Sequence, residues 1–210
     1  MPAELPDFFA RYYSKPGATY IDPFAGQGVQ MQVANLLGMN YVGMDACAEY
    51  IAYSHAVLDR IDTGSRRIEV HLGDSRHPVD QLEDSIGDFC FTSPPYWDIE
   101  YYGPEAEQLG TGQTYQEFLD GLKDVFVAWL PKFKSGAYIA VNVNDIRRES
   151  TFIPYHADVI RLLSQAGYRL RDTWIVEGLI SGLPRAFGVS FNMQRIAPKV
   201  HEYVLIAQAP

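Results

Sequence analysis

Residues 18–28 read ATYIDPFAGQG, and this stretch decides the predicted fold. The apolar residues before Asp22 are typical of a buried strand, and a helix is predicted from Val29 onward. Glycines at positions 26 and 28 let a ligand approach the backbone, and the first turn of a helix presents free N–H groups. The stretch therefore predicts a ligand site between a strand and a helix.

The alternation of strand and helix continues along the whole chain. Strands are predicted at residues 18–22, 40–45, 67–72, 88–92, 136–143, 169–177 and 202–207, and helices at 29–37, 49–58, 115–133 and 154–167. This pattern indicates an α/β, Rossmann-like doubly wound fold with a mostly parallel seven-stranded sheet and an antiparallel C-terminal strand pair. The length suits a single domain, 1–210, with residues 178–201 as a small basic loop or hairpin insertion.

Polar residues follow four of the predicted strands. Ligands bind such sheets beyond the carboxyl ends of the strands, so Asp22, Asp45, Asp74 and Ser93 should converge on one crevice. Asp45 stands 19 positions after Gly26, where an acid commonly accepts hydrogen bonds from ribose hydroxyls. No Gly-rich phosphate loop with its lysine is present. The crevice therefore suits an uncharged or zwitterionic nucleoside better than a nucleotide.

A second motif, Ser93-Pro94-Pro95-Tyr96-Trp97, follows a predicted buried strand. Two prolines cannot donate backbone hydrogen bonds, so the strand must end there. The turn fixes a hydroxyl, a carbonyl and two aromatic rings at a strand end, which suits a flat ring that bears an amine. Acceptors at the Ser93 hydroxyl and the Pro94 carbonyl would activate that amine, while Tyr96 stacks on the ring and Trp97 walls the pocket. The alternative is a plain strand-ending turn with both rings in the core.

The two motifs resemble those of a known family, the S-adenosylmethionine-dependent DNA amino-methyltransferases. DPFAGQG at 22–28 is similar to the family's cofactor motif, and TSPPYW at 92–97 to its catalytic motif. Gly43-Met44-Asp45 and Leu72-Gly73-Asp74 stand between them in the matching order, and residues 199–206 are similar to the closing strand. The resemblance implies a class I methyltransferase fold, S-adenosyl-L-methionine as cofactor and a flipped-out DNA base as substrate.

The resemblance also implies roles for individual residues. It makes the whole turn catalytic: Ser93, Pro94, Pro95, Tyr96 and Trp97. For the cofactor, it places Asp22 at the amino-acid end, Phe24, Gly26 and Gly28 along the methionine, Asp45 at the ribose and Asp74 at the adenine, with Ser93 also at the cofactor.

The target base follows from the first position of the catalytic motif. Serine there resembles the cytosine-N4 enzymes, whereas the adenine-N6 enzymes more often carry Asn or Asp, so N4 of cytosine is favoured. Methylation of carbon 5 is excluded because it needs a Pro-Cys nucleophile, and neither Cys47 nor Cys90 follows a proline. A methyltransferase of RNA bases or protein glutamine, and a non-catalytic subunit of a larger assembly, stay open as alternatives.

The net charge of −9 is unusual for a DNA-binding protein, but it is concentrated in one segment. Residues 78–124 hold eleven acids and one lysine, whereas residues 178–201 hold no acid. The expected DNA contacts are Arg147, Arg148, Arg185, Arg195 and Lys199. Because little of the chain is left for target recognition, we expect a homodimer or a partner protein to supply it.

Other features place the chain in a broad class. The two cysteines are predicted to be small buried hydrophobes, and the five histidines have no metal-ligand spacing, so we expect no metal. The sequence has no apolar run long enough to span a bilayer and no signal-peptide pattern. We therefore expect a cytoplasmic protein, as a DNA methyltransferase of a restriction-modification system would be.

Overall fold

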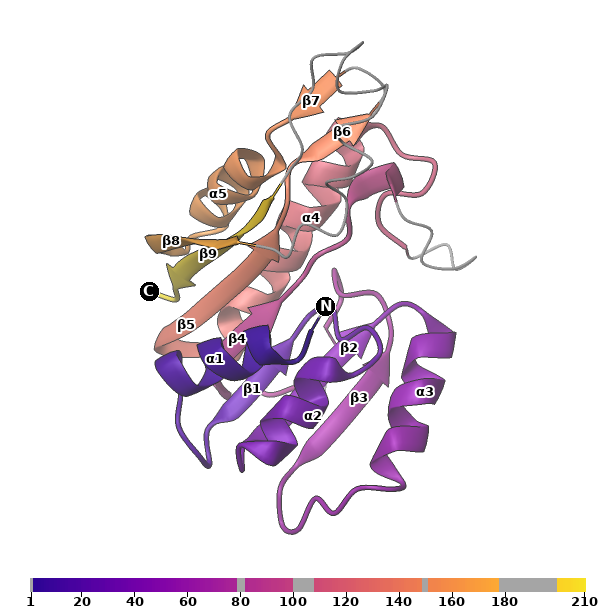
Figure 1. The fold of residues 1–210 in the computed structure, drawn as a ribbon, viewed down its shortest axis with the longest axis vertical. Coiled ribbons are helices and arrows are strands. Elements are labelled where there is room, and N and C mark those ends of the chain that lie inside the picture. Colours follow the sequence, from indigo (N-terminus) through magenta and orange to yellow (C-terminus); the bar gives the residue numbers. More distant parts are fainter. Residues whose placement is uncertain (1, 79–81, 100–107, 149–150, 178–199) are drawn as a thin grey trace.

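The computed structural model describes residues 2–78, 82–99, 108–148, 151–177 and 200–210 (Figure 1). Its elements in chain order are α1 (Glu4–Tyr13), β1 (Thr19–Asp22), α2 (Val29–Leu36), β2 (Asn40–Asp45), α3 (Ala48–Leu58), β3 (Ile68–Leu72), β4 (Gly87–Thr92), η1 (Trp97–Ile99), α4 (Tyr115–Trp129), η2 (Leu130–Lys132), β5 (Phe133–Val143), β6 (Ile146–Arg148), β7 (Thr151–Ile153), α5 (Tyr155–Gln165), β8 (Arg169–Glu177) and β9 (His201–Gln208).

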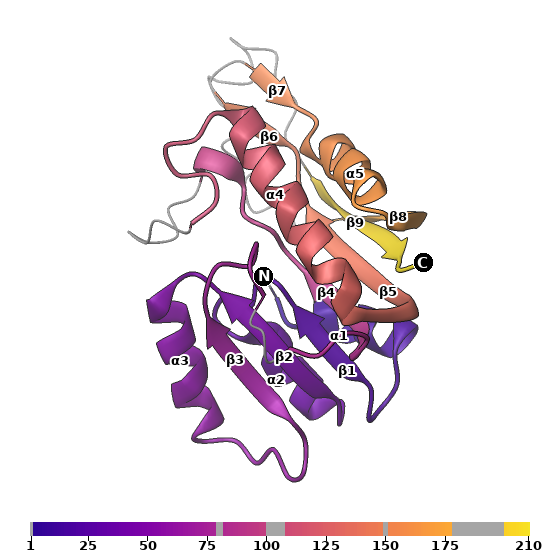
Figure 2. The ribbon, with the colours of Figure 1, turned by 180° about the vertical axis from the view of Figure 1, so that it is seen from behind.

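The main sheet has seven strands in the order β3-β2-β1-β4-β5-β9-β8. Strands β1 to β5 are parallel, and β9 runs antiparallel to both of its neighbours, β5 and β8. Helices α1, α2 and α3 cover one face and α4 and α5 the other (Figures 1 and 2). The predicted doubly wound fold with an antiparallel C-terminal pair is therefore confirmed.

Helix α4 begins and ends for reasons that the sequence contains. Thr114 and Glu117 form a capping box, in which the Thr114 hydroxyl accepts from the Glu117 N–H and the Glu117 carboxylate accepts from the Thr114 N–H. The helix ends at Trp129, and the predicted end at Phe133 is wrong. Pro131 lacks an N–H and cannot continue the helical ladder, so the chain passes through η2 into β5.

Two elements were not predicted, helix α1 and the short two-stranded sheet β6–β7. In α1, apolar side chains recur every four residues and pack in the smaller core cluster, on the face of the sheet that α1, α2 and α3 cover. They are Leu5, Phe9 and Tyr13. Phe9 stacks on Phe91 of β4, with ring centroids 5.5 Å apart. The periodicity of α1 is thus visible in the sequence. The strands β6 and β7 hold three residues each, too few for a periodic signal.

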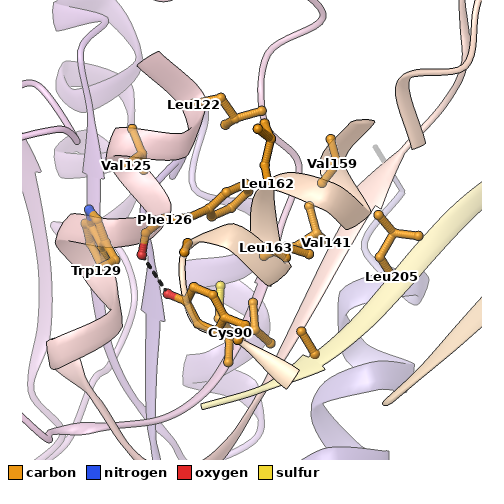
Figure 3. Packing of buried hydrophobic residues seen from close by; sticks show 14 of the residues in the cluster. Cys90, Leu122, Val125, Phe126, Trp129, Val141, Val159, Leu162, Leu163 and Leu205 are labelled. Atoms are coloured by element: carbon orange, nitrogen blue, oxygen red, sulfur yellow. Dashed lines mark hydrogen bonds between the residues drawn. The ribbon is translucent and has the colours of Figure 1, made fainter. Parts of the chain in front are cut away.

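The larger core cluster joins α4, α5 and the sheet (Figure 3). The Tyr168 hydroxyl donates to the Phe126 carbonyl at 3.0 Å, and the Trp129 indole N–H donates to the Ser75 carbonyl at 2.9 Å. This core therefore also fixes the loop after β3. Both cysteines are free and buried, as predicted. Within the described residues, none of the helices combines the length and apolar character that crossing a bilayer requires.

Candidate functional site

A cavity of about 100 Å³ lies at the carboxyl ends of β2, β3 and β4. It is lined by Phe24, Gly26, Asp45, Ala46, Tyr50, Asp74, Ser75, Ser93, Pro95, Gln108, Leu109 and Val125. Three of the four strand-end residues expected to converge, Asp45, Asp74 and Ser93, therefore meet in one cavity. The fourth, Asp22, lies at the end of β1 and is not part of the lining.

Asp45 ties the glycine turn to the end of β2. One carboxylate oxygen accepts from the Gly26 N–H at 2.8 Å, and the other accepts from the Cys47 N–H at 2.9 Å. Gly26 has a φ of +52°, a left-handed conformation that glycine adopts without strain. The carboxylate is thus held at the cavity wall, where a ligand hydroxyl could donate to it.

Gly28, which was expected along the cofactor, does not line the cavity. It has a φ of +74° and caps the start of α2. A Cβ at this position would lie 2.8 Å from the Ser54 hydroxyl of α3. The positive φ and the closeness of Ser54 therefore both favour glycine at this position, for reasons of backbone conformation and packing.

Asp74 is held in a bidentate ion pair with Arg76. The guanidinium donates from Nη2 at 2.6 Å and from Nε at 2.9 Å, and the Arg76 backbone N–H donates as well. Burial would raise the pKa of Asp74, but the hydrogen bonds and positive charge of Arg76 outweigh it, so the pKa lies below its usual value. Asp74 is therefore an anionic acceptor at the cavity wall.

Asp22 is fully buried beneath the cavity and accepts three hydrogen bonds. They come from the Thr92 hydroxyl at 2.7 Å, the Phe24 N–H at 3.0 Å and the Tyr41 hydroxyl at 3.1 Å. Burial raises the pKa of Asp22 to about 7 even though these donors oppose the shift. In this position the side chain holds the two motifs together.

The Pro-Pro turn is supported by helix α5. Ser93 and Pro95 line the cavity, while Pro94 is buried. The Tyr155 hydroxyl at the start of α5 donates to the Pro95 carbonyl at 3.0 Å, and its ring meets Tyr96 edge to face at 5.9 Å. Tyr96 is half-buried and packs against the larger core cluster, as the alternative of core packing expects, and it is not among the lining residues of the cavity.

Trp97 has a φ of +47°, which is rare for a large side chain. Its indole N–H donates to the Gln113 carbonyl at 2.9 Å, and its ring meets Tyr115 at 5.2 Å. The Arg148 guanidinium lies over the ring, 4.4 Å from the centroid. Several contacts together thus hold Trp97 in a strained conformation at the edge of the site.

Of the five expected DNA contacts, two belong to the described residues. Arg148 lies over Trp97 and pairs with Asp98 at 2.9 Å, so it already supports the turn. Arg147 is exposed on β6. The others, Arg185, Arg195 and Lys199, lie outside the described residues, as does almost all of the basic segment 178–201.

Six lining residues were not predicted, and they fall into two groups. The first group comes soon after the strand-end acids, so its place in the sequence could have identified it. Ala46 and Tyr50 follow Asp45, and Ser75 follows Asp74. Gln108, Leu109 and Val125 reach the cavity only through tertiary packing. For Gln108 and Leu109, the one signal in the sequence is the glycine that follows them, Gly110, which adopts a φ of +101°.

The fold and the cavity define the class I methyltransferase architecture. A geranyl diphosphate methyltransferase in complex with SAM aligns with a TM-score of 0.64 at 11% identity, covering 99% of this chain and 85% of that one. The [4+2]-cyclase SpnF aligns with a TM-score of 0.65 at 14% identity, covering 99% and 81%. At such identities the likeness shows the fold alone, and the cyclase illustrates that one fold hosts different reactions.

The sequence comparisons point to one family within that architecture. Residues 1–56 match the family model described as DNA methylase. The type II methyltransferase M.SmaI of Serratia marcescens is 28% identical over 85 residues, 40% of this chain and 29% of that protein. The match thus spans less than a third of the relative. Both findings support the DNA amino-methyltransferase family, which the two motifs resemble.

The close approach of Gly110 to Trp97 gives a testable prediction. A Cβ on Gly110 would lie 2.4 Å from the Trp97 carbonyl oxygen, whereas one on Gly112 would meet nothing within 4 Å. Both glycines have positive φ, so alanine costs backbone strain of about 1–2 kcal/mol at either position. We expect Gly110→Ala to lower the free energy of unfolding in urea clearly more than Gly112→Ala does. Equal losses would contradict the contact.

The buried carboxyl of Asp22 predicts a pH dependence of stability. Because its pKa of about 7 exceeds the unfolded value of 3.8, the native state keeps a proton that the unfolded state loses between these values. Stability therefore falls as pH rises from about 4 to 7. Between pH 5 and pH 8, wild type should lose on the order of 2 kcal/mol more unfolding free energy than Asp22→Asn. Parallel pH profiles in urea titrations would contradict the raised pKa.

Proposed function

We propose that this chain is an S-adenosylmethionine-dependent DNA methyltransferase that methylates the exocyclic N4 amine of a flipped-out cytosine. The observation that carries the proposal is the meeting of two motifs in one cavity. Ser93 and Pro95 of the Pro-Pro turn face the same space as Asp45 and Asp74 of the nucleoside-type crevice. The match of residues 1–56 to the DNA methylase model supports DNA as the substrate.

The charges of the cavity fit the proposed cofactor. Two carboxylates, Asp45 and Asp74, are among its described lining residues, which include no lysine or arginine. The ion pair with Arg76 balances the charge of Asp74, so the negative charge at the cavity comes from Asp45. A phosphate-bearing nucleotide would be repelled, whereas a ligand with a sulfonium cation and an ammonium group would be attracted. Asp45 would hold the ribose hydroxyls and Asp74 the adenine amine, while Phe24 and Gly26 would border the methionine part.

The mechanism follows from the acceptors at the turn. The bound cofactor supplies a methyl group on a positively charged sulfur. The Ser93 hydroxyl and the Pro94 carbonyl would accept hydrogen bonds from the two N–H groups of the target amine, which localises its lone pair for in-line attack on the methyl carbon. The carbon–sulfur bond would break as the carbon–nitrogen bond forms, so that S-adenosylhomocysteine leaves and the amine gives up one proton to solvent. Tyr96, braced by Tyr155, would stack on the extruded base. No covalent enzyme intermediate is needed.

The choice of base rests on Ser93, and N6 of adenine is the second candidate because a hydroxyl can accept from either amine. The partner is also part of the proposal. In this proposal a second copy or another protein would supply part of the target recognition. The match covers only 29% of the type II relative, so the target recognition of that protein is not carried over to this chain.

The ribose assignment predicts a loss of cofactor binding in Asp45→Asn. An amide at this position cannot accept the ribose hydroxyls and the Gly26 and Cys47 N–H groups together, so S-adenosylmethionine affinity should fall by about 1–3 kcal/mol in calorimetry. Asp59→Asn, at the exposed end of α3, is the matched control. Unchanged affinity in Asp45→Asn would contradict the assignment.

The catalytic assignment predicts that Ser93→Ala keeps cofactor binding and loses methyl transfer. Loss of one acceptor at the amine should lower the rate at least about 100-fold, measured as labelled methyl groups incorporated into DNA. Ser164→Ala, on the exposed side of α5, is the control. If Ser93→Ala also abolishes cofactor binding, the side chain has a structural role instead.

A further inference from the structure

The ribbon formed by β6 and β7 extends beyond the carboxyl end of β5, next to the Pro-Pro turn (Figures 1 and 2). Its register pairs Ile146 with Ile153 and Arg147 with Phe152. Side chains alternate between the faces of a strand, so Arg147 and Phe152 share one face and the isoleucine pair lies on the other. The ribbon thus has two faces with different chemistry.

One face anchors the ribbon to the site. Ile146 is 2% exposed within the larger core cluster, and Ile153 packs against the same cluster. Arg148 shares this face and places its guanidinium over Trp97 while pairing with Asp98. The ribbon is therefore fixed to the candidate catalytic turn, and its position relative to the cavity is set.

The other face presents an aromatic ring and a cation to solvent. Phe152 is 49% exposed, and the Arg147 guanidinium lies 5.5 Å from its ring centroid. The six strand residues carry two arginines and no acid, and Glu149, which follows β6 in the sequence, lies outside the described residues. A ring beside a guanidinium can pack on a base or sugar while the cation reaches a phosphate.

We infer that the β6–β7 ribbon contacts DNA beside the target nucleotide, with Phe152 packing on a base or sugar and Arg147 contacting a backbone phosphate. The inference rests on the proposed function, because it takes DNA as the substrate. A two-stranded ribbon is of a size that a DNA groove admits, and exposed apolar side chains at such contacts can fill space between unstacked bases. Arg148 supports the turn and Arg147 is the cation that binds DNA.

The test measures binding of a short fluorescein-labelled DNA duplex of mixed sequence, and of its single strand, by anisotropy with S-adenosylhomocysteine present. Phe152→Ala should weaken binding about 10-fold, the order expected for one lost stacking contact. Arg147→Ala should make the slope of log affinity against log salt concentration shallower by about 1, the change expected for one lost phosphate contact. Phe8→Ala is the matched control, since Phe8 is 45% exposed on α1.

The outcomes separate this inference from the proposed function. If wild type methylates DNA and Phe152→Ala and Arg147→Ala bind it as wild type does, the ribbon assignment is overturned and the proposed function stands. If Phe8→Ala weakens binding as much as Phe152→Ala, the assignment is also overturned. If wild type binds S-adenosylmethionine but neither DNA probe, the ribbon assignment is overturned, and nucleoside mass spectrometry of DNA from cells that express the chain decides the proposed function separately. Unchanged calorimetric affinity for the cofactor in both ribbon variants shows that the variants fold.

Discussion

The buried carboxylate of Asp22 is the interaction on which the rest of the site depends. Its three donors belong to the end of β4, to β2 and to the turn after β1, so one side chain joins both motifs from below. Each donor left without its acceptor would cost about 1–3 kcal/mol, because all three groups are buried or partly buried. The distance between the glycine turn and Ser93 is therefore fixed by a hydrogen-bond network that lies outside the cavity.

The Pro-Pro turn is fixed by a different set of contacts. Trp97 keeps a left-handed backbone, a conformation that costs on the order of 1–3 kcal/mol and persists only where neighbours determine it. Gln113, Tyr115 and Arg148 are those neighbours, and Tyr155 holds the preceding Pro95. The proposed reaction requires that both the Pro-Pro turn and the Asp22 hydrogen-bond network be rigid, since two acceptors must meet one amine with defined geometry.

The sequence allowed prediction of the parts of the site that local chemistry determines. Strand ends, glycine turns and the Pro-Pro stop each have a local signature, so Asp45, Asp74 and Ser93 could be placed together before the structure was known. Gly28 and Asp22 were also singled out, but neither lines the cavity: Gly28 caps the start of α2, and Asp22 is buried and bonded to Thr92, a tertiary contact that has no local signal. The β6–β7 ribbon was missed for the same reason, because pairing over three residues depends on tertiary anchoring.

The proposed reaction at this cavity and turn is methylation of an exocyclic amine of a DNA base. Nucleoside mass spectrometry of DNA from cells that express the chain, compared with cells that carry an empty vector, tests it most directly. The account predicts N4-methylcytosine in the first sample alone. N6-methyladenine in its place would keep the reaction and change the base. Neither modified base, in cells that contain folded and cofactor-binding protein, would contradict the account.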